Sequence, residues 1–230
     1  ENICTSDDYV CRSLKLSQSD RFLNFMPMFH IGGLVDLLLA PLAAGGSVVC
    51  TSSFSRSNFF EWLEQFQPTW FQGVPTMLYE LLELDATEKQ IVNNSPLRFI
   101  RSVAAALPNK ARNNLAAVFN VPIIETYGMT EAAPLITSTA LPPETHKPGS
   151  VGKSLGTQIA ILDEADQILP SGQIGEIVLQ GKNIIPGYEN NPQANGKSFT
   201  QGWFRTGDRG YLDEEGYLFL TGRLKEMINR

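Results

Sequence analysis

Between residues 21 and 127, short apolar runs alternate with segments whose apolar residues recur at helical spacing. Phe59, Trp62 and Phe66 follow Ser55 and Ser57, either of which can cap a helix, and Pro68 ends that segment. Residues 97–103 and 121–124 are typical of strands, and residues 109–119 are typical of a helix. This alternation predicts right-handed crossovers and a largely parallel sheet covered by helices.

After Pro148-Gly149 the pattern changes to short strands separated by turns. Residues 158–162 and 175–179 each indicate a strand, and residues 213–216 indicate a hairpin turn between two more. Turn signals this frequent favour a small antiparallel barrel or sandwich. We therefore predict an α/β subdomain over residues 1–140 and a β-barrel-like subdomain over residues 141–224.

Composition excludes several classes of protein. The net charge is −6, and its acidic and basic residues are interspersed, so no basic face for nucleic acid is expected. The three cysteines form no Cys-x-x-Cys pair, which argues against a disulfide framework or a zinc site and favours a reducing cytoplasm. The longest apolar run, residues 34–42, contains Asp36 and is too short to span a membrane. No secretory leader is expected, and a cytoplasmic protein is predicted.

The first polar cluster, residues 126–131, directly follows the predicted strand 121–124. Open α/β sheets bind ligands at the carboxyl ends of their parallel strands. The Tyr127 ring can stack on a base, a Thr130 hydroxyl can donate to phosphate, and the Glu131 carboxylate can hold Mg²⁺. Gly128 allows close approach of a ligand to the backbone. The same residues also fit an ordinary strand-to-helix loop with a capping threonine.

Two further clusters contain candidate site residues. Asp208 follows Gly207 and can accept hydrogen bonds from both hydroxyls of a ribose, while Arg223 can donate to the sugar or to a phosphate. A turn aspartate paired with a surface arginine fits this pattern equally well. His30 lies among apolar residues before Gly32-Gly33, where a lone histidine is also typical of a structural residue.

Taken in order, four segments resemble the adenylate-forming superfamily of acyl- and aryl-CoA synthetases, luciferases and peptide-synthetase adenylation domains. They are residues 27–30 (PMFH), 127–131 (YGMTE), 203–208 (WFRTGD) and 222–226 (GRLKE). The resemblance covers essentially the whole chain. It implies that a carboxylic acid attacks the α-phosphorus of ATP, giving an acyl-adenylate and pyrophosphate. A thiol, from CoA or a carrier-protein phosphopantetheine, then displaces AMP.

The resemblance also implies roles for individual residues. Tyr127 would stack on adenine beside Gly128, Thr130 would contact the α-phosphate, and Glu131 would coordinate Mg²⁺. Asp208 would bind the ribose hydroxyls with help from Arg223.

Three more positions take implied roles from the same resemblance. The loop that contains Ser102, Ala104 and Ala105 would line adenine and the acyl group. His30 would gate the acid pocket near the thiol tunnel. Lys225 would be the hinge, within residues 225–230, to a small C-terminal domain.

The resemblance further implies that the chain is an internal piece of the large N-terminal domain. The phosphate loop would precede residue 1 and the lysine that serves adenylation would follow residue 230, so we expect weak nucleotide binding and little turnover.

Residues 100–102, 146–153 and 222–230 are similar to the oxalate–CoA ligase-like branch. Pro134 departs from that branch, because a histidine for the second carboxylate is expected there and proline has no hydrogen-bonding side chain. Two alternatives remain open at this stage. One is a module that loads a carrier protein, in which Asp36 could hold a substrate amino group, and the other is a non-catalytic nucleotide-binding remnant.

Overall fold

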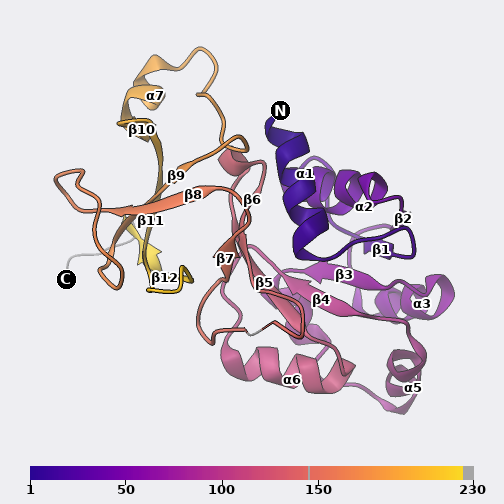
Figure 1. Cartoon of the computed structure of the whole chain (residues 1–230). Helices are drawn as coiled ribbons and strands as arrows, with labels where there is room; N and C mark the ends of the chain where they lie inside the picture. The colour runs from indigo at the N-terminus through magenta and orange to yellow at the C-terminus, as the bar shows by residue number, and fades with distance from the viewer. Residues whose placement is uncertain (145, 225–230) are drawn as a thin grey trace.

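The computed structural model describes residues 1–144 and 146–224, which form two sheets joined side by side (Figure 1). The first sheet has seven strands in the order β2-β1-β3-β4-β5-β6-β7. Its strands are β2 (Ser47–Cys50), β1 (Arg21–Asn24), β3 (Trp70–Gly73), β4 (Phe99–Ser102), β5 (Ile123–Gly128), β6 (Leu135–Ser138) and β7 (Lys153–Ser154). Strands β2 to β5 are parallel, whereas β6 and β7 are antiparallel additions.

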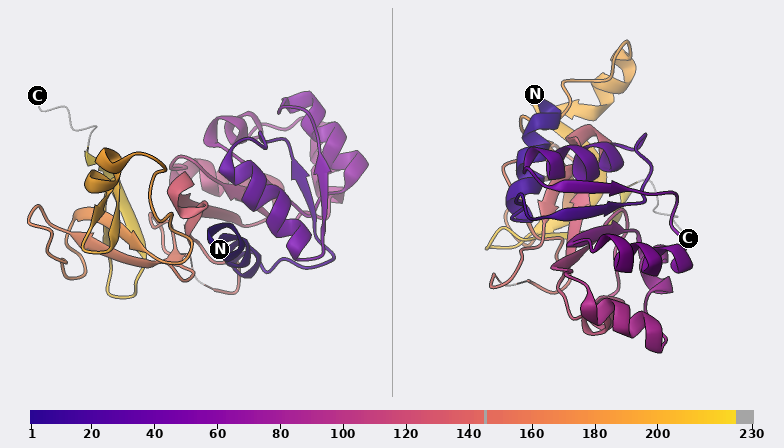
Figure 2. Two further views of the ribbon diagram at one scale, coloured as in Figure 1. Left: turned by 90° about the horizontal axis from the view of Figure 1, so that it is seen from above. Right: turned by 90° about the vertical axis from the view of Figure 1, so that its right-hand side faces the viewer.

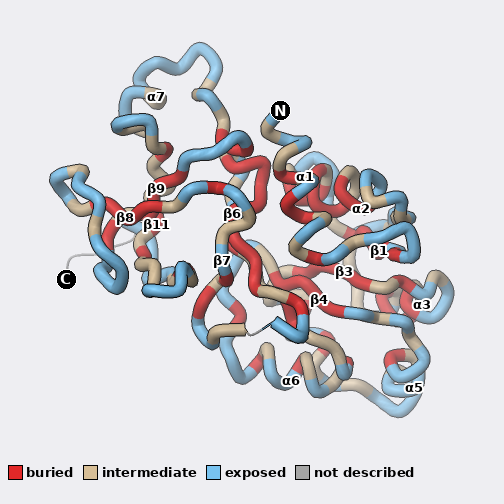
Figure 3. Tube along the Cα trace, viewed as in Figure 1, coloured by how far each residue is buried: buried red, intermediate tan, exposed pale blue. Residues whose placement is uncertain are grey.

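Helices cover both faces of this sheet (Figure 2). One face packs against α1 (Asn2–Ser13), the π-helix η1 (Gly32–Leu39) and α2 (Ala40–Ala43). The other packs against α3 (Arg56–Phe66), α4 (Pro75–Glu80), α5 (Ala86–Asn94) and α6 (Asn109–Phe119). Figure 3 shows the buried residues concentrated along the central strands and the inner faces of these helices. The predicted helix-covered, largely parallel sheet is confirmed.

Helix α3 shows how a local signal sets an element boundary. The Ser55 side chain accepts a hydrogen bond from the Asn58 backbone N–H at 3.3 Å, so Ser55 rather than Ser57 is the cap. The helix ends at Phe66, and Gln67 adopts a left-handed conformation just before Pro68.

Strand β5 is longer than the expected strand 121–124. It runs to Gly128 because β6 pairs with it in antiparallel register, with Thr126 opposite Ser138 and Tyr127 opposite Thr137. Tyr127 and Gly128 therefore lie in the strand, which corrects the expected strand end at residue 124 and argues against the alternative of a strand-to-helix loop. The partner strand that extends β5 cannot be read from the local apolar pattern.

The second sheet is antiparallel and open, with β11 at its centre. Its strands are β8 (Gln158–Leu162), β9 (Gly175–Gln180), β10 (Phe199–Thr200), β11 (Trp203–Leu212) and β12 (Leu218–Arg223), with α7 (Pro192–Ser198) before β10. Its core is a separate apolar cluster that includes Ile177, Leu179 and Phe204. A small antiparallel β subdomain after the parallel sheet is thus confirmed as a fold class.

The connection between the two sheets crosses the predicted subdomain boundary. Strand β7 follows residue 140 but pairs with β6 in the first sheet. Within residues 1–144 and 146–224, no helix combines the length and apolar character needed to cross a membrane. The predicted hinge at Lys225 and residues 225–230 lies outside the described residues.

Candidate functional site

Tyr127, Asp208 and Arg223 meet where the two sheets join. The Tyr127 hydroxyl donates a hydrogen bond to Asp208 Oδ2 at 2.6 Å, from β5 to β11. Arg223 Nε lies 3.0 Å from Asp208 Oδ1, because β12 pairs with β11 so that Arg223 stands opposite Asp208. One carboxylate is therefore held from both sides by two other predicted site residues.

A β-bulge directs Asp208 toward this junction. The register of β11 against β9 shifts between Arg205 and Arg209, and Gly207 inside the bulge has φ +72°, a left-handed conformation that favours glycine. Thr206 Oγ1 accepts from the Asp208 backbone N–H at 3.0 Å and donates to the Ile177 carbonyl at 2.7 Å. The bulge is thus fixed to β9, and the direction of the Asp208 side chain is set.

Burial differs sharply along this triad. Tyr127 and Asp208 are only 8% and 7% exposed, whereas the Arg223 side chain is 66% exposed. Burial raises the pKa of the Tyr127 phenol, and the neighbouring Asp208 carboxylate raises it further. The phenol therefore keeps its proton and remains a donor, while the Arg223 guanidinium is open to a ligand.

Glu131 lies in a short 3₁₀ helix, η2 (Thr130–Ala132), directly after β5. The Tyr188 hydroxyl donates to Glu131 Oε1 at 2.9 Å, and the Ile185 backbone N–H donates to the Glu131 carbonyl at 2.9 Å. Burial raises the pKa of Tyr188, and Glu131 adds to that effect. Within the described part of the chain, Glu131 Oε2 has no hydrogen-bond or ion-pair partner, and the exposed Thr130 hydroxyl has none either.

Ser102, Ala104 and Ala105 lie at the carboxyl end of β4, next to β5. Ser102 stands opposite Glu125 in the parallel register, and its buried Oγ has no hydrogen-bond partner within the described ranges. Ala104 and Ala105 are exposed, and Ala104 has φ +70°. The loop therefore shares the sheet edge with Tyr127, which is the arrangement expected for one ligand site.

His30 follows β1 and is exposed. Its Nδ1 accepts a hydrogen bond from the Gly32 backbone N–H at 3.1 Å, which fixes the ring against the start of η1. Strands β3 and β4 separate β1 from β5, and within the described ranges no interaction joins His30 to Tyr127, Glu131 or Asp208. The structure thus places His30 at the same edge of the sheet but apart from the triad.

A comparison with protein families agrees with a nucleotide site at this junction. The family model described as "AMP-binding enzyme" matches residues 1–189. The chain belongs to the AMP-binding enzyme family. This confirms the family expected from the four sequence segments.

Curated relatives and a solved structure agree with this assignment. The chain is 42% identical to the oxalate–CoA ligase of Saccharomyces cerevisiae (strain ATCC 204508 / S288c), over 100% of this chain and 42% of the relative. It is 40% identical to the sulfoacetate–CoA ligase of Cupriavidus necator (strain ATCC 17699 / DSM 428 / KCTC 22496 / NCIMB 10442 / H16 / Stanier 337), over 99% of this chain and 44% of the relative. The O-succinylbenzoate coenzyme A synthetase of Bacillus subtilis, solved with ATP and magnesium, is 30% identical with a TM-score of 0.86, covering 99% of this chain and 46% of that one. The chain thus spans less than half the length of these relatives.

The side chains near η2 fit a magnesium ion bound together with a nucleotide better than a metal held by the protein alone. Among residues 1–144 and 146–224, no group of three or more His, Cys, Asp or Glu side chains converges on one point. Mg²⁺ in nucleotide sites is bound through one or two carboxylates plus phosphates and water. Glu131, with one carboxylate oxygen unpartnered in the described structure, could provide such a single protein ligand.

Gly128 has a structural role in addition to the expected one. A Cβ at this position would lie 2.3 Å from the Pro134 carbonyl oxygen, closer than side-chain carbons approach backbone atoms. The Met129 backbone N–H donates to that same carbonyl at 2.9 Å. The tight return of the chain from β5 to β6 therefore requires glycine here, whatever ligand is bound.

Asp36 is committed to an internal ion pair. Arg101 donates to Asp36 Oδ2 at 2.7 Å and to Gln72 Oε1 at 2.8 Å, and all three residues are buried. Asp36 in η1 is thereby bonded to Arg101 of β4, which is also bonded to Gln72 of β3. The pairing with Arg101 argues against Asp36 as a holder of a substrate amino group.

Asn183 and Tyr188 are site-supporting residues that the sequence motifs did not indicate. Asn183 is fully buried, and its Nδ2 donates to the carbonyls of Ala132 and Leu135 at 3.0 and 3.1 Å. Both residues lie in an irregular segment after β9, where periodicity carries no information. The Gly187-Tyr188 pair was the only local signal, and it resembles an ordinary turn.

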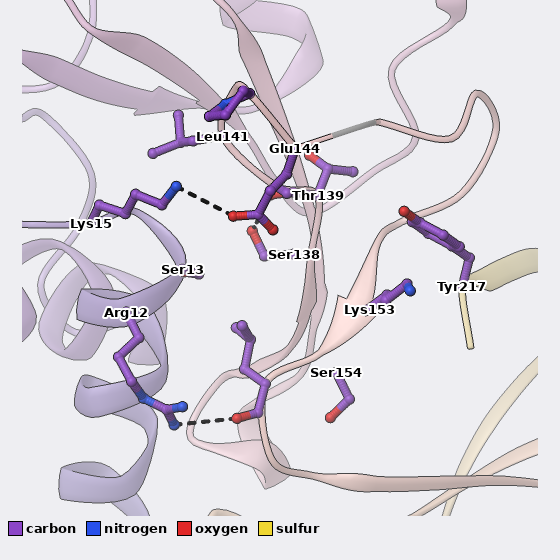
Figure 4. A pocket seen from close by; sticks show the side chains of 13 residues that line it. Arg12, Ser13, Lys15, Ser138, Thr139, Leu141, Glu144, Lys153, Ser154 and Tyr217 are labelled. Carbon is purple, nitrogen blue, oxygen red and sulfur yellow. Dashed lines mark hydrogen bonds and ion pairs between the residues drawn. The ribbon is translucent and has the colours of Figure 1, made fainter. Parts of the chain in front are cut away.

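A cavity of about 540 Å³ lies elsewhere, between α1, β7 and the chain around Leu141 (Figure 4). Lys15 points across it toward Glu144, and Arg12 donates to the Leu155 carbonyl at its rim. None of the predicted site residues lines this cavity. It is therefore separate from the Tyr127–Asp208–Arg223 junction.

Proposed function

We propose that this AMP-binding chain is the nucleotide-binding part of an AMP-forming acid–CoA ligase. Such an enzyme activates a small carboxylic acid with ATP to an acyl-adenylate and then transfers the acyl group to CoA. The observation that carries the proposal is the Tyr127–Asp208–Arg223 junction, with Glu131 four residues after Tyr127. Relatives named as oxalate–CoA and sulfoacetate–CoA ligases support the thiol and the acid class.

The ribose contact follows from the geometry of Asp208. Each carboxylate oxygen has two lone pairs, and Tyr127 and Arg223 each use one of them. The remaining lone pairs can accept both hydroxyls of a ribose. Because Tyr127 holds Asp208 by its hydroxyl, the same contact fixes the Tyr127 ring, which we propose stacks on adenine beside Gly128 and the Ser102–Ala105 loop.

The phosphate contacts are assigned to η2. We propose that the Thr130 hydroxyl donates to the α-phosphate and that Glu131 holds Mg²⁺, which would neutralise charge on the phosphates. In-line attack by the acid then needs positioning and charge neutralisation rather than a side-chain nucleophile. His30, at the same sheet edge, is proposed to gate the acid, and Lys225 to act as the hinge to a C-terminal domain.

The class of acid is proposed from the relatives and from one departure. Oxalate and sulfoacetate, named for two relatives, are small acids with a second anionic group. In this chain Pro134 is buried and presents no polar side chain, so any second anionic group would need another partner. We therefore propose a small carboxylic acid as the substrate, and we assign Pro134 no role in its recognition.

The remaining proposals concern the organisation of the protein. We propose subdomains over residues 1–140 and 141–224, with β7 of the second paired to β6 of the first. We also propose a cytoplasmic location, for which the three free cysteines are suitable. CoA is proposed rather than a carrier protein, because the relatives reported above are named as CoA ligases or synthetases.

Calorimetry with a non-hydrolysable acyl-adenylate analogue tests the proposed function. We expect the wild-type chain to bind the analogue. The affinity of Asp208→Asn should be lower by about 10-fold or more, because a charge-assisted contact to the ribose is weakened. Asp163→Asn, whose carboxylate bonds only the backbone of its own turn among the interactions of the described residues, is the matched control and should bind as wild type. Equal affinity of Asp208→Asn and wild type would contradict the ribose assignment.

A further inference from the structure

Glu131 and its 3₁₀ helix are held by a segment that comes from the second half of the chain. We call residues 183–195 the strap, which runs from the end of β9 into α7. Asn183 bonds the carbonyls of Ala132 and Leu135, the Ile185 N–H bonds the Glu131 carbonyl, and Tyr188 bonds the Glu131 carboxylate. Two of the three residues of η2, Glu131 and Ala132, are therefore held by strap residues.

The strap is itself rigidly anchored at both ends. At one end, Asn183 is fully buried and accepts a hydrogen bond on Oδ1 from Thr157 at 3.0 Å, so its amide is bonded on both sides. At the other end, Asn195 Oδ1 accepts from the Tyr188 backbone N–H at 2.7 Å, and Asn195 Nδ2 donates to the Tyr188 carbonyl at 2.9 Å. These two bonds fix the backbone of Tyr188, from which its hydroxyl reaches Glu131.

The group that donates a hydrogen bond to the Glu131 carboxylate is a neutral phenol and not a cation. A lysine or arginine would orient the carboxylate but would also cancel its charge and compete with a cation. The Tyr188 phenol is neutral, occupies Oε1 alone, and leaves Oε2 free of partners in the described structure. Groups that hydrogen-bond a metal-binding carboxylate fix its orientation and commonly alter metal affinity by 10- to 100-fold.

We propose that Tyr188 is a positioning residue, which orients the Glu131 carboxylate through Oε1 so that Oε2 receives a divalent cation carried by the nucleotide. Asn195 supports this role by fixing the Tyr188 backbone. The proposal rests on the proposed function, which assigns the cation to Glu131.

Mn²⁺ titration followed by electron paramagnetic resonance tests this role in the whole chain with ATP present. Tyr188→Phe removes only the hydroxyl, and Tyr79→Phe, on the exposed end of α4, is the matched control. We expect Tyr188→Phe to weaken Mn²⁺ affinity by about 10-fold and Tyr79→Phe to leave it unchanged. Asn195→Ala should weaken Mn²⁺ binding in the same direction but less, because the phenol remains present.

ATP affinity measured by calorimetry without metal distinguishes a loss of Glu131 orientation from a general disturbance of the nucleotide site. If Tyr188 acts only by orienting Glu131, the Tyr188→Phe variant should bind metal-free ATP as tightly as wild type does. An equal loss of metal-free and metal-dependent binding would overturn the proposal, as would Mn²⁺ affinity equal to that of Tyr79→Phe. Failure of the wild-type chain to bind ATP would instead contradict the proposed function, and the inference would fall with it.

Discussion

Tyr127 and Asp208 are 81 residues apart, yet the Tyr127 hydroxyl donates to the Asp208 carboxylate at 2.6 Å across the junction of the two sheets. The bond is buried, and it joins β5, which ends the parallel part of the first sheet, to the central strand of the second. It fixes together the two side chains proposed to contact adenine and ribose. The relative placement of the two sheets thus sets the geometry of the candidate site.

Tyr127→Phe should destabilise the protein and weaken nucleotide binding. Removal of the hydroxyl leaves a buried, charged acceptor with one partner fewer, which costs about 1–3 kcal/mol. Denaturant unfolding would measure the loss, with Tyr79→Phe as the control that removes an exposed hydroxyl. Unfolding free energies of the two variants that agree within 0.5 kcal/mol, about the error of such comparisons, would contradict this expectation.

Arg101→Met should be strongly destabilising, because it leaves the buried Asp36 carboxylate without its charge partner. Breaking a buried pair from one side costs about 3–5 kcal/mol. The double variant Arg101→Met/Asp36→Leu should recover much of that loss, since no unpaired charge remains. Urea unfolding of both single variants and the double variant gives the coupling, and additive losses would refute the buried ion pair as the cause.

Ionisation of Asp7 should lower the free energy of unfolding as the pH rises from about 4 to 6. Burial, together with the nearby Asp36 carboxylate, raises the pKa of Asp7 to about 6 in the folded protein. Because an unfolded aspartate has a pKa of about 3.9, the folded state binds more protons in this window, and ionisation of Asp7 opposes folding above it.

Asp7→Asn removes this titration and should raise the melting temperature relative to wild type at pH 7.5 more than at pH 4.5. Asp8→Asn, which lies on the same helix and pairs with Arg12 at the surface, is the control and should show no such gain. Melting temperatures of the three proteins at the two pH values test this expectation. A gain for Asp7→Asn that is equal at both values would argue against the raised pKa as its cause.

Gly33→Ala should be destabilising through backbone collision. The added Cβ would lie 2.0 Å from the Pro27 carbonyl oxygen, and the backbone of the loop that precedes η1 would have to move. Overpacking of this kind costs about 1–3 kcal/mol. Gly196→Ala, in α7 with open space around the new Cβ, should be neutral or slightly stabilising in the same unfolding assay.

Elements governed by neighbouring residues were predictable from the sequence. Helix α6 occupies the expected residues 109–119, and α3 begins after one of the two expected caps. Apolar periodicity, capping and proline act within a few residues, so a local pattern is sufficient for them. The motif segments likewise identified the family, because the order of their residue types is a property of the chain alone.

The tertiary structure decided how these residues come together. Pairing with β6 extended β5 through Tyr127, and the bulge in β11 aimed Asp208 at it. Tyr188 reaches Glu131 over 57 residues from a segment without periodicity. Such contacts arise from strand pairing and packing between distant parts of the chain, which no local pattern encodes. The sequence by itself therefore determined the family and the candidate residues, whereas only the fold decided which of them lie together and what holds Glu131 in place.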